Sequence, residues 1–117
     1  MKKIAVVGSR DFTDYLLLAE ILELFFDKGF EIISGGAEGA DSLAENYATR
    51  KRLKCTVFKA DWDVHGKSAG FIRNQLIVDA ADIVVAFWDG VSKGTKDTLD
   101  KAHKARKITL IVYFNVG

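Results

Sequence analysis

Four short segments at the ends of apolar runs carry hydroxyl or charged side chains, and three of them also contain glycine. They are segments 8–12, 34–41, 60–63 and 88–95. A glycine-rich turn lets backbone N–H groups approach a phosphate closely, and a helix that starts at the turn adds a favourable field for negative charge. These residue types therefore indicate anion binding, in which backbone amides and hydroxyl groups hold a phosphate.

Segment 34–41, Ser-Gly-Gly-Ala-Glu-Gly-Ala-Asp, is the most informative of the four. It leaves an apolar run and leads straight into a stretch with helical spacing, so Gly35, Gly36 and Gly39 would lie beside the start of a helix. Two interpretations are open. Either the glycines bring amides to a phosphate, or they form a tight turn whose backbone dihedral angles require glycine.

Segment 88–95, Trp-Asp-Gly-Val-Ser-Lys-Gly-Thr, repeats this arrangement after another apolar run. Gly90 and Gly94 make its backbone adaptable, while Ser92 and Thr95 add hydroxyl donors. Two such segments at one edge of a sheet favour phosphate binding over a pair of unrelated turns.

Three larger side chains are further candidates. Arg73 would offer positive charge to a phosphate, although an arginine next to apolar positions on a helix also fits a solvated surface role. Trp62 and Trp88 each follow an apolar run, where an indole can stack on a base or pack in the core. His65 and His103 have no companions at metal-ligand spacing, so we predict neither a metal site nor a cofactor.

The elements that must position these residues alternate between apolar runs and segments of helical spacing. Several runs are continuously apolar, as in strands covered on both faces of a parallel sheet. We predict strands at Ile4–Val7, Phe30–Ile33, Thr56–Phe58, Ile83–Trp88 and Ile108–Phe114. We predict helices at Tyr15–Lys28, Asp41–Lys51, Ala69–Ala81 and Lys96–Ala105.

This alternation predicts an α/β fold of three layers, α/β/α, with right-handed crossovers, formed by residues 1–117 as one domain. In an open parallel sheet, ligands bind beyond the carboxyl ends of the strands, which is where all four segments lie. The longest irregular stretch, 60–67, favours a mobile or functional loop.

The composition indicates which compartment and which partners to expect for this protein. Hydrophobic residues make up 49% of the sequence and charged residues 28%, so a core can form without disulfides. The single Cys55 cannot form an intrachain disulfide, and no apolar stretch is long enough for a signal peptide or a bilayer span. We therefore expect a cytoplasmic protein with no membrane partner. The formal net charge of +1 gives no general attraction to nucleic acid.

Taken together, the motifs strongly resemble the YspA/YpsA-related branch of the SLOG superfamily, a branch found in bacteria and phages. That superfamily also includes the DprA and lonely-guy proteins. The resemblance rests on segments 8–12, 34–41, 66–70 and 86–95 and on the pair Arg73 and Asn74. It implies a Rossmann-like sandwich whose five-stranded parallel sheet has the order 3-2-1-4-5. It also implies a site for a nucleotide derivative near the first and fourth strands.

The resemblance also bears on catalysis. In the lonely-guy enzymes, an arginine before the fourth strand and a glutamate in a Gly-Gly-x-Gly-Thr-x-x-Glu motif are catalytic. Arg73 matches the arginine, whereas the glutamate position falls on Thr98, which carries no charge. Asp97 is acidic but points about 100° away around the helix. Opening a glycosidic bond usually needs a carboxylate, and Glu38 or Asp41 would have to supply it.

The leading hypothesis is that this protein binds or senses a phosphate-bearing nucleotide or nucleotide-derived metabolite. The partner would be a small molecule of the NAD, ADP-ribose or nucleoside monophosphate type. The first alternative is an N-glycosidase or phosphoribohydrolase that uses Arg73 and Glu38. The expected ligand-binding residues are Gly8, Ser9, Arg10, Gly35, Gly36, Gly39, Asp41, Arg73, Asn74, Trp88, Gly90, Ser92, Gly94 and Thr95.

The second alternative is a nucleic-acid or protein-interaction module. The near-neutral net charge and the lack of an extended basic and aromatic stripe count against nucleic acid as a partner. Apolar helix faces would also allow two copies of the chain to pair, so a homodimer is among the expected forms.

Overall fold

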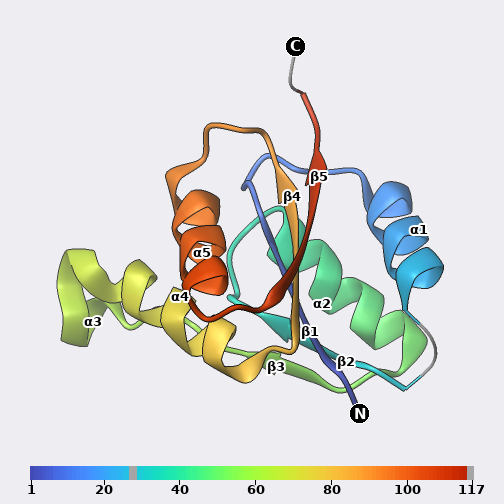
Figure 1. Ribbon diagram of the computed structural model, residues 1–117, viewed down its shortest axis with the longest axis horizontal. Helices are drawn as coiled ribbons and strands as arrows, with labels where there is room; N and C mark the ends of the chain where they lie inside the picture. The colour runs from blue at the N-terminus through green and yellow to red at the C-terminus, as the bar shows by residue number, and fades with distance from the viewer. Residues whose placement is uncertain (27–28, 116–117) are drawn as a thin grey trace.

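The computed structural model describes residues 1–26 and 29–115, which form a sheet flanked by helices (Figure 1). The strands are β1 (Lys3–Gly8), β2 (Glu31–Ser34), β3 (Cys55–Val57), β4 (Ile83–Trp88) and β5 (Ile108–Tyr113). The helices are α1 (Tyr15–Phe25), α2 (Ala40–Lys51), α3 (Trp62–His65), α4 (Ala69–Ala80) and α5 (Lys93–Lys104). A short 3-10 turn, η1 (Gly66–Ser68), joins α3 to α4.

All strand pairs in the sheet are parallel, and their order is β3-β2-β1-β4-β5. This is the expected Rossmann-like order 3-2-1-4-5, so the predicted fold class is confirmed. The sheet order reverses at β1, which pairs with β2 on one side and with β4 on the other. The loops that follow β1, β2 and β4 therefore meet at one edge of the sheet.

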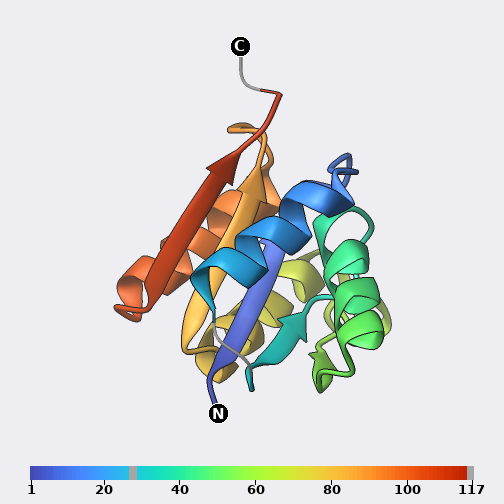
Figure 2. The same ribbon diagram turned by 90° about the vertical axis from the view of Figure 1, so that its right-hand side faces the viewer.

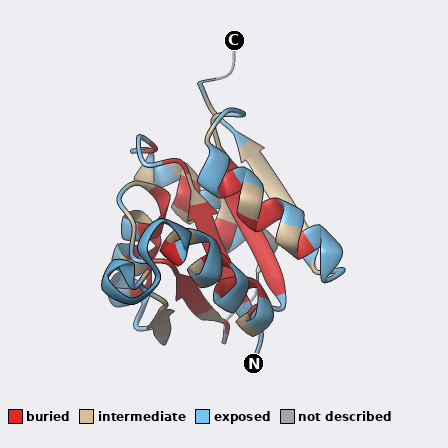
Figure 3. Ribbon diagram, turned by 90° about the vertical axis from the view of Figure 1, so that its left-hand side faces the viewer, coloured by how far each residue is buried: buried red, intermediate tan, exposed pale blue. Residues whose placement is uncertain are grey.

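Each face of the sheet has its own apolar core, because side chains alternate between faces along a strand. Ile4 and Val6 of β1 pack with α1 and α2, whereas Ala5 and Val7 pack with α4 and α5. Figure 2 shows α1 and α2 in front of the sheet and α5 behind it. Figure 3 shows buried central strands and exposed outer helix surfaces. This burial on both faces fixes where the loops at the carboxyl edge start.

The helix bounds differ from the predicted ones mainly near glycines. Helix α5 begins at Lys93, three residues before the predicted start at Lys96, because Gly94 and Thr95 already belong to its first turn. The helix predicted for Tyr15–Lys28 ends at Phe25, and its predicted last two residues, 27 and 28, lie outside the described residues.

Segment 60–67 was predicted to be irregular and instead contains α3 and most of η1. The carboxylate of Asp61 accepts a hydrogen bond from the amide of Val64 at 3.2 Å, which caps the first turn of α3. This local cap explains why the stretch is helical even though it carries no helical apolar pattern. No helix in residues 1–26 and 29–115 is long and apolar enough to cross a bilayer.

Candidate functional site

The loops after β1, β2 and β4 enclose a cavity of about 450 Å³ at the carboxyl edge of the sheet. The starts of α2 and α5 and one side of α4 complete its wall. Its lining residues are Val7, Gly8, Ser9, Arg10, Asp11, Ala37, Asp41, Arg73, Asn74, Ile77, Asp89, Ser92, Gly94, Thr95 and Thr98. Nine of the predicted ligand-binding residues are among them: Gly8, Ser9, Arg10, Asp41, Arg73, Asn74, Ser92, Gly94 and Thr95. The topology thus brings together four separate parts of the chain.

The glycines at this edge allow close packing of the backbone. A Cβ atom at Gly8 would lie 2.7 Å from the Cβ of Ala40, so glycine there lets α2 start directly against β1. Gly39 has a φ of +79°, and a Cβ there would lie 2.6 Å from the carbonyl oxygen of Arg10. Both positions therefore exclude larger residues for reasons of packing and backbone conformation.

In the first glycine loop, residues 34–39, backbone amides donate hydrogen bonds to acceptors of the protein itself, and we call this segment the closed loop. The Gly35 amide donates to the Asp41 carboxylate at 2.9 Å, and the Ala37 amide donates to the same oxygen at 3.4 Å. The Gly36 amide donates to the hydroxyl of Ser34 at 3.2 Å. Asp41 and Ser34 therefore occupy the amides of Gly35 and Gly36, and the role of these amides in holding a phosphate stays a prediction.

The second glycine loop, residues 89–95, leaves amides unused, and we call it the open loop. The Asp89 carboxylate accepts hydrogen bonds from the amides of Val91 and Ser92, at 3.0 and 2.8 Å. The amides of Gly94 and Thr95, in the first turn of α5, have no hydrogen-bond partner among the described residues. The open loop therefore keeps the donors that an anion would need.

Asp41 is the buried carboxylate of the site. Burial raises its pKa to about 6, although hydrogen bonding from Ala37, the charge of Arg73 and hydrogen bonding from Gly35 each oppose this shift. By contrast, hydrogen bonds from Val91 and Ser92 lower the pKa of Asp89. Near neutral pH, the charge on Asp41 therefore responds to small changes in pH.

Arg73 is the half-buried cation of the site. Its Nη1 donates to the carbonyl oxygen of Gly35, and its Nε donates to Oδ1 of Asn74 at 3.0 Å. Burial lowers the pKa of Arg73, the charge of Asp41 raises it and the charge of Arg10 lowers it further. Its Nη2 has no hydrogen-bond partner among the described residues and remains available to a ligand.

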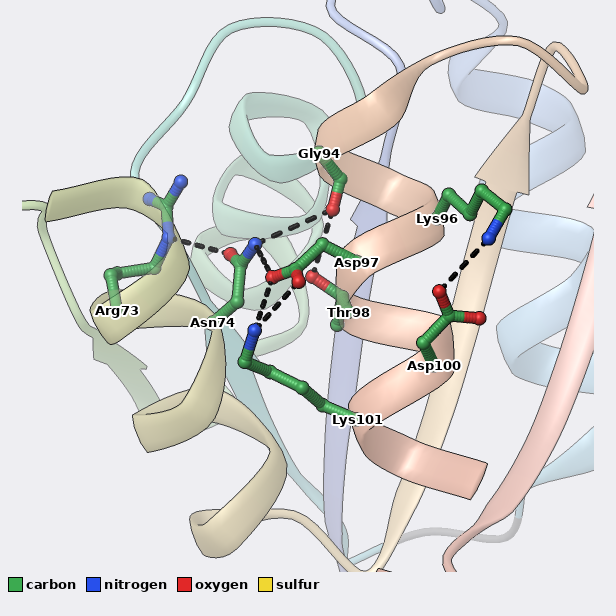
Figure 4. A network of polar contacts seen from close by, with 8 residues as sticks. All are labelled: Arg73, Asn74, Gly94, Lys96, Asp97, Thr98, Asp100 and Lys101. Carbon is green, nitrogen blue, oxygen red and sulfur yellow. Dashed lines mark hydrogen bonds and ion pairs between the residues drawn. The ribbon is translucent and has the colours of Figure 1, made fainter. Parts of the chain in front are cut away.

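Asn74 connects Arg73 to α5 (Figure 4). Its Nδ2 donates to the Asp97 carboxylate at 3.0 Å and lies 3.4 Å from the carbonyl oxygen of Gly94. The ammonium group of Lys101 binds the same carboxylate at 2.6 Å. Asp97 therefore faces α4 and Lys101 and does not line the cavity, in agreement with its predicted direction.

Thr98 lines the cavity at the position that the resemblance assigned to a glutamate. Its hydroxyl donates to the carbonyl oxygen of Gly94 at 3.2 Å and is almost fully buried. This side chain supplies no carboxylate. The catalytic roles of Arg73 and Glu38 stay predictions.

Several predicted residues lie elsewhere. Gly39, Trp88 and Gly90 line neither this cavity nor the one beside it. The indole of Trp88 packs beside Tyr113 and donates to the carbonyl oxygen of Ser92 at 3.1 Å. Trp88 therefore contacts the open loop through Ser92 and lines neither cavity, and its part in ligand binding stays a prediction.

A second cavity of about 400 Å³ adjoins the first and shares Arg10, Ala37 and Arg73 with it. Its other lining residues are Gly35, Gly36, Glu38, Lys59, Ala60 and Trp62. Sequence reasoning gave no role to Lys59. Lys59 directly follows the third apolar run, at the end of a strand where ligands bind, and this position could have identified it as a candidate.

The sheet order defines a Rossmann-like α/β fold with a cavity at the carboxyl edge, where the strand order reverses. The chain belongs to the YspA, cpYpsA-related SLOG family, whose family model matches residues 2–65. It is 34% identical over 114 residues to the Gene 61 protein of Mycobacterium phage D29, covering 90% of this chain and 91% of that protein.

Two solved structures share the fold. DNA processing protein A (DprA) from Streptococcus pneumoniae superposes with a TM-score of 0.77 at 20% identity, covering 95% of this chain and 50% of that chain. DprA from Helicobacter pylori, described for its single-stranded DNA binding mode, gives a TM-score of 0.73 at 22% identity, with coverages of 94% and 64%. This chain thus spans about half to two thirds of the DprA chains.

These comparisons correct the predicted partner. We expected a small nucleotide-derived molecule and considered nucleic acid unlikely, because the net charge is near neutral and the sequence lacks an extended basic and aromatic stripe. Both similar structures are DNA-processing proteins, and one is described as binding single-stranded DNA. Neither description names a small-molecule ligand. The error has a physical reason, since net charge is a sum over the whole surface and says nothing of cations gathered at one edge.

Proposed function

We propose that this protein binds single-stranded nucleic acid at the carboxyl edge of its sheet, with one backbone phosphate held in the first cavity. The observation that carries the proposal is the convergence of four donors on that cavity. They are the guanidinium groups of Arg10 and Arg73 and the amides of Gly94 and Thr95, which have no partner among the described residues.

The charged side chains around the cavity fit a whole nucleotide, with its sugar and base, better than a free phosphate ion. Three carboxylates, Asp11, Asp41 and Asp89, also line it. Two of them turn an oxygen to backbone amides of their own loops, which reduces their repulsion of a phosphate. Asp11 is exposed and makes no hydrogen bond within the described residues, so it suits the amino group of a base or a sugar hydroxyl.

The fold comparison supports the same class of ligand, because DprA from Helicobacter pylori is described as binding single-stranded DNA. A single strand also fits the geometry better than a duplex. The two cavities are concave and lie between loops, whereas a duplex requires a protruding helix or an extended surface.

Fluorescence anisotropy with a labelled 15-nucleotide strand of mixed sequence tests the proposal. We expect binding that weakens with salt, with a slope of about −0.7 in log K against log salt for the one phosphate contacted. Arg73→Ala should weaken binding by about tenfold or more, because it removes a charged donor. Lys104→Ala is the matched control, since Lys104 is exposed at the far end of α5.

Three results would contradict the proposal. The first is no binding of the strand at low salt, and the second is equal binding by wild type and the Arg73→Ala variant. The third is tighter binding of a duplex, or of a free mononucleotide, than of the single strand.

A further inference from the structure

The second cavity opens directly beside the first, and the guanidinium groups of Arg10 and Arg73 lie at their shared boundary. Arg73 is held there by Gly35 on one side and by Asn74 on the other, which leaves Nη2 free between the cavities. Arg10 is exposed and makes no ion pair among the described residues. An anion at this boundary would therefore be contacted from both cavities.

Trp62 forms the outer wall of the second cavity. Its side chain is 56% exposed and has no aromatic partner among the described residues. A Cβ at Gly70 would lie 3.6 Å from Cη2 of the indole, so one edge of the ring lies close to α4 while more than half of the side chain is exposed. An exposed indole next to a cationic cavity is the arrangement on which an unpaired base stacks.

Lys59 adds a cation on the same side. The side chain is exposed, and its stem passes over Gly36, where an added Cβ would lie 3.1 Å from Lys59 Cγ. Its ammonium group makes no hydrogen bond or ion pair within the described residues. The cavity thus has a stacking surface at its rim and an unpaired cation beside it.

We infer that the second cavity is a nucleoside subsite and that the unit recognised is a dinucleotide step of a single strand. The phosphate between the two nucleotides is the one held in the first cavity, where Arg10 and Arg73 also line the second cavity; one nucleoside lies beside it at Asp11, and the base of the other stacks on Trp62. Lys59 contacts the next phosphate along the strand. This inference rests on the proposed function, since it assigns the path of the strand on the same edge.

The test uses the full chain and the 15-nucleotide strand, with substitutions on α3. Trp62→Ala should weaken binding by about fivefold or more, whereas Trp62→Phe should stay within about twofold because a phenyl ring still stacks. Val64→Ala is the matched control, because Val64 is exposed on the same short helix but lines neither cavity. Its binding should equal that of wild type.

A second strand of equal length, with abasic sugars in place of all nucleosides, separates stacking from phosphate contacts. Wild type and Trp62→Ala should bind it equally. Addition of the intact strand should quench tryptophan fluorescence in wild type, and this quenching should be lost in Trp62→Phe.

The outcomes distinguish the two proposals. If Trp62→Ala binds the intact strand like wild type while Arg73→Ala does not, the nucleoside subsite is wrong and the phosphate site stands. If wild type binds no strand, both fail. If the abasic strand is also bound less tightly by Trp62→Ala, Trp62 does not act by stacking, and the inference is overturned.

Discussion

The closed loop and the open loop have similar sequences and opposite roles. Both follow a strand of the sheet, both contain glycines, and both lead into a helix of twelve residues. In the closed loop, the amides of Gly35, Gly36 and Ala37 are bonded to Asp41 and Ser34. In the open loop, the amides of Gly94 and Thr95 have no partner among the described residues.

The difference comes from where each loop places its acidic side chain. Asp41 lies in the first turn of α2, so its carboxylate reaches back over the preceding loop. Asp89 lies before its helix and reaches only as far as Ser92. A glycine pattern therefore tells us where amides are accessible, and a nearby acceptor determines whether they remain so.

The largest effect is expected from the glycine that shapes the closed loop. Gly39→Ala should lower the free energy of unfolding by about 3 kcal/mol, because it forces alanine to a φ of +79° and against the Arg10 carbonyl. The corresponding change in the open loop, Gly94→Ala, meets no atom within 4 Å and lies in a helix, so stability should rise by about 0.5 kcal/mol. Urea denaturation measures both, and equal losses would contradict this contrast.

The second-largest difference in stability between the two loops is expected when the carboxylate of each is removed. Asp41→Ala leaves the amides of Gly35 and Ala37 without an acceptor in a buried place, and should cost about 2 kcal/mol in unfolding free energy. Asp89→Ala should cost less, because water reaches the amides of the open loop. Thermal denaturation by circular dichroism compares the two variants. A greater loss for Asp89→Ala would reverse the roles we give to the loops.

The pH dependence of stability should reflect the closed loop. Because burial raises the pKa of Asp41 to about 6, folding disfavours its ionised form, and stability is gained as pH falls through 6. With an unfolded pKa near 3.9, the protein should be about 1 kcal/mol more stable at pH 5 than at pH 7.5 from this group alone. Urea titrations at the two pH values test this. Asp41→Asn should remove the difference, and its persistence there would assign the effect to another group.

The smallest effect, on binding affinity, is expected for Asn74, which accepts a hydrogen bond from Arg73 and lies close to the open loop. Arg73 bonds the closed loop at Gly35, and Asn74 lies within bonding distance of the open loop at Gly94. Asn74→Ala should weaken binding of the single strand by about threefold, because Arg73 loses the acceptor of its Nε. Anisotropy titration measures this, with exposed Gln75→Ala as the control. Equal affinities for Asn74→Ala and wild type would show that Arg73 needs no such support.

Much of the site was accessible to sequence reasoning because the sheet topology places strand ends together. Nine predicted residues, including Ser9, Arg73 and Thr95, line one cavity although they come from four separate parts of the chain. Trp88 lines neither cavity, and the sequence does not show which way a side chain at the end of a strand points. Lys59 was given no role for the same reason, whereas Trp62 was named from the sequence with base stacking and core packing both left open.

Alternating apolar runs and helical segments were sufficient to establish the strands, the three layers and the edge at which a ligand would bind, because these follow from side-chain periodicity and chain connectivity. The availability of each amide depended on tertiary structure. A hydrogen bond requires an acceptor within about 3 Å, and the Asp41 carboxylate reaches the amides of Gly35 and Ala37 only when α2 packs against the end of β2. That packing, which no spacing of glycines specifies, leaves one loop closed on itself and the other open to a phosphate.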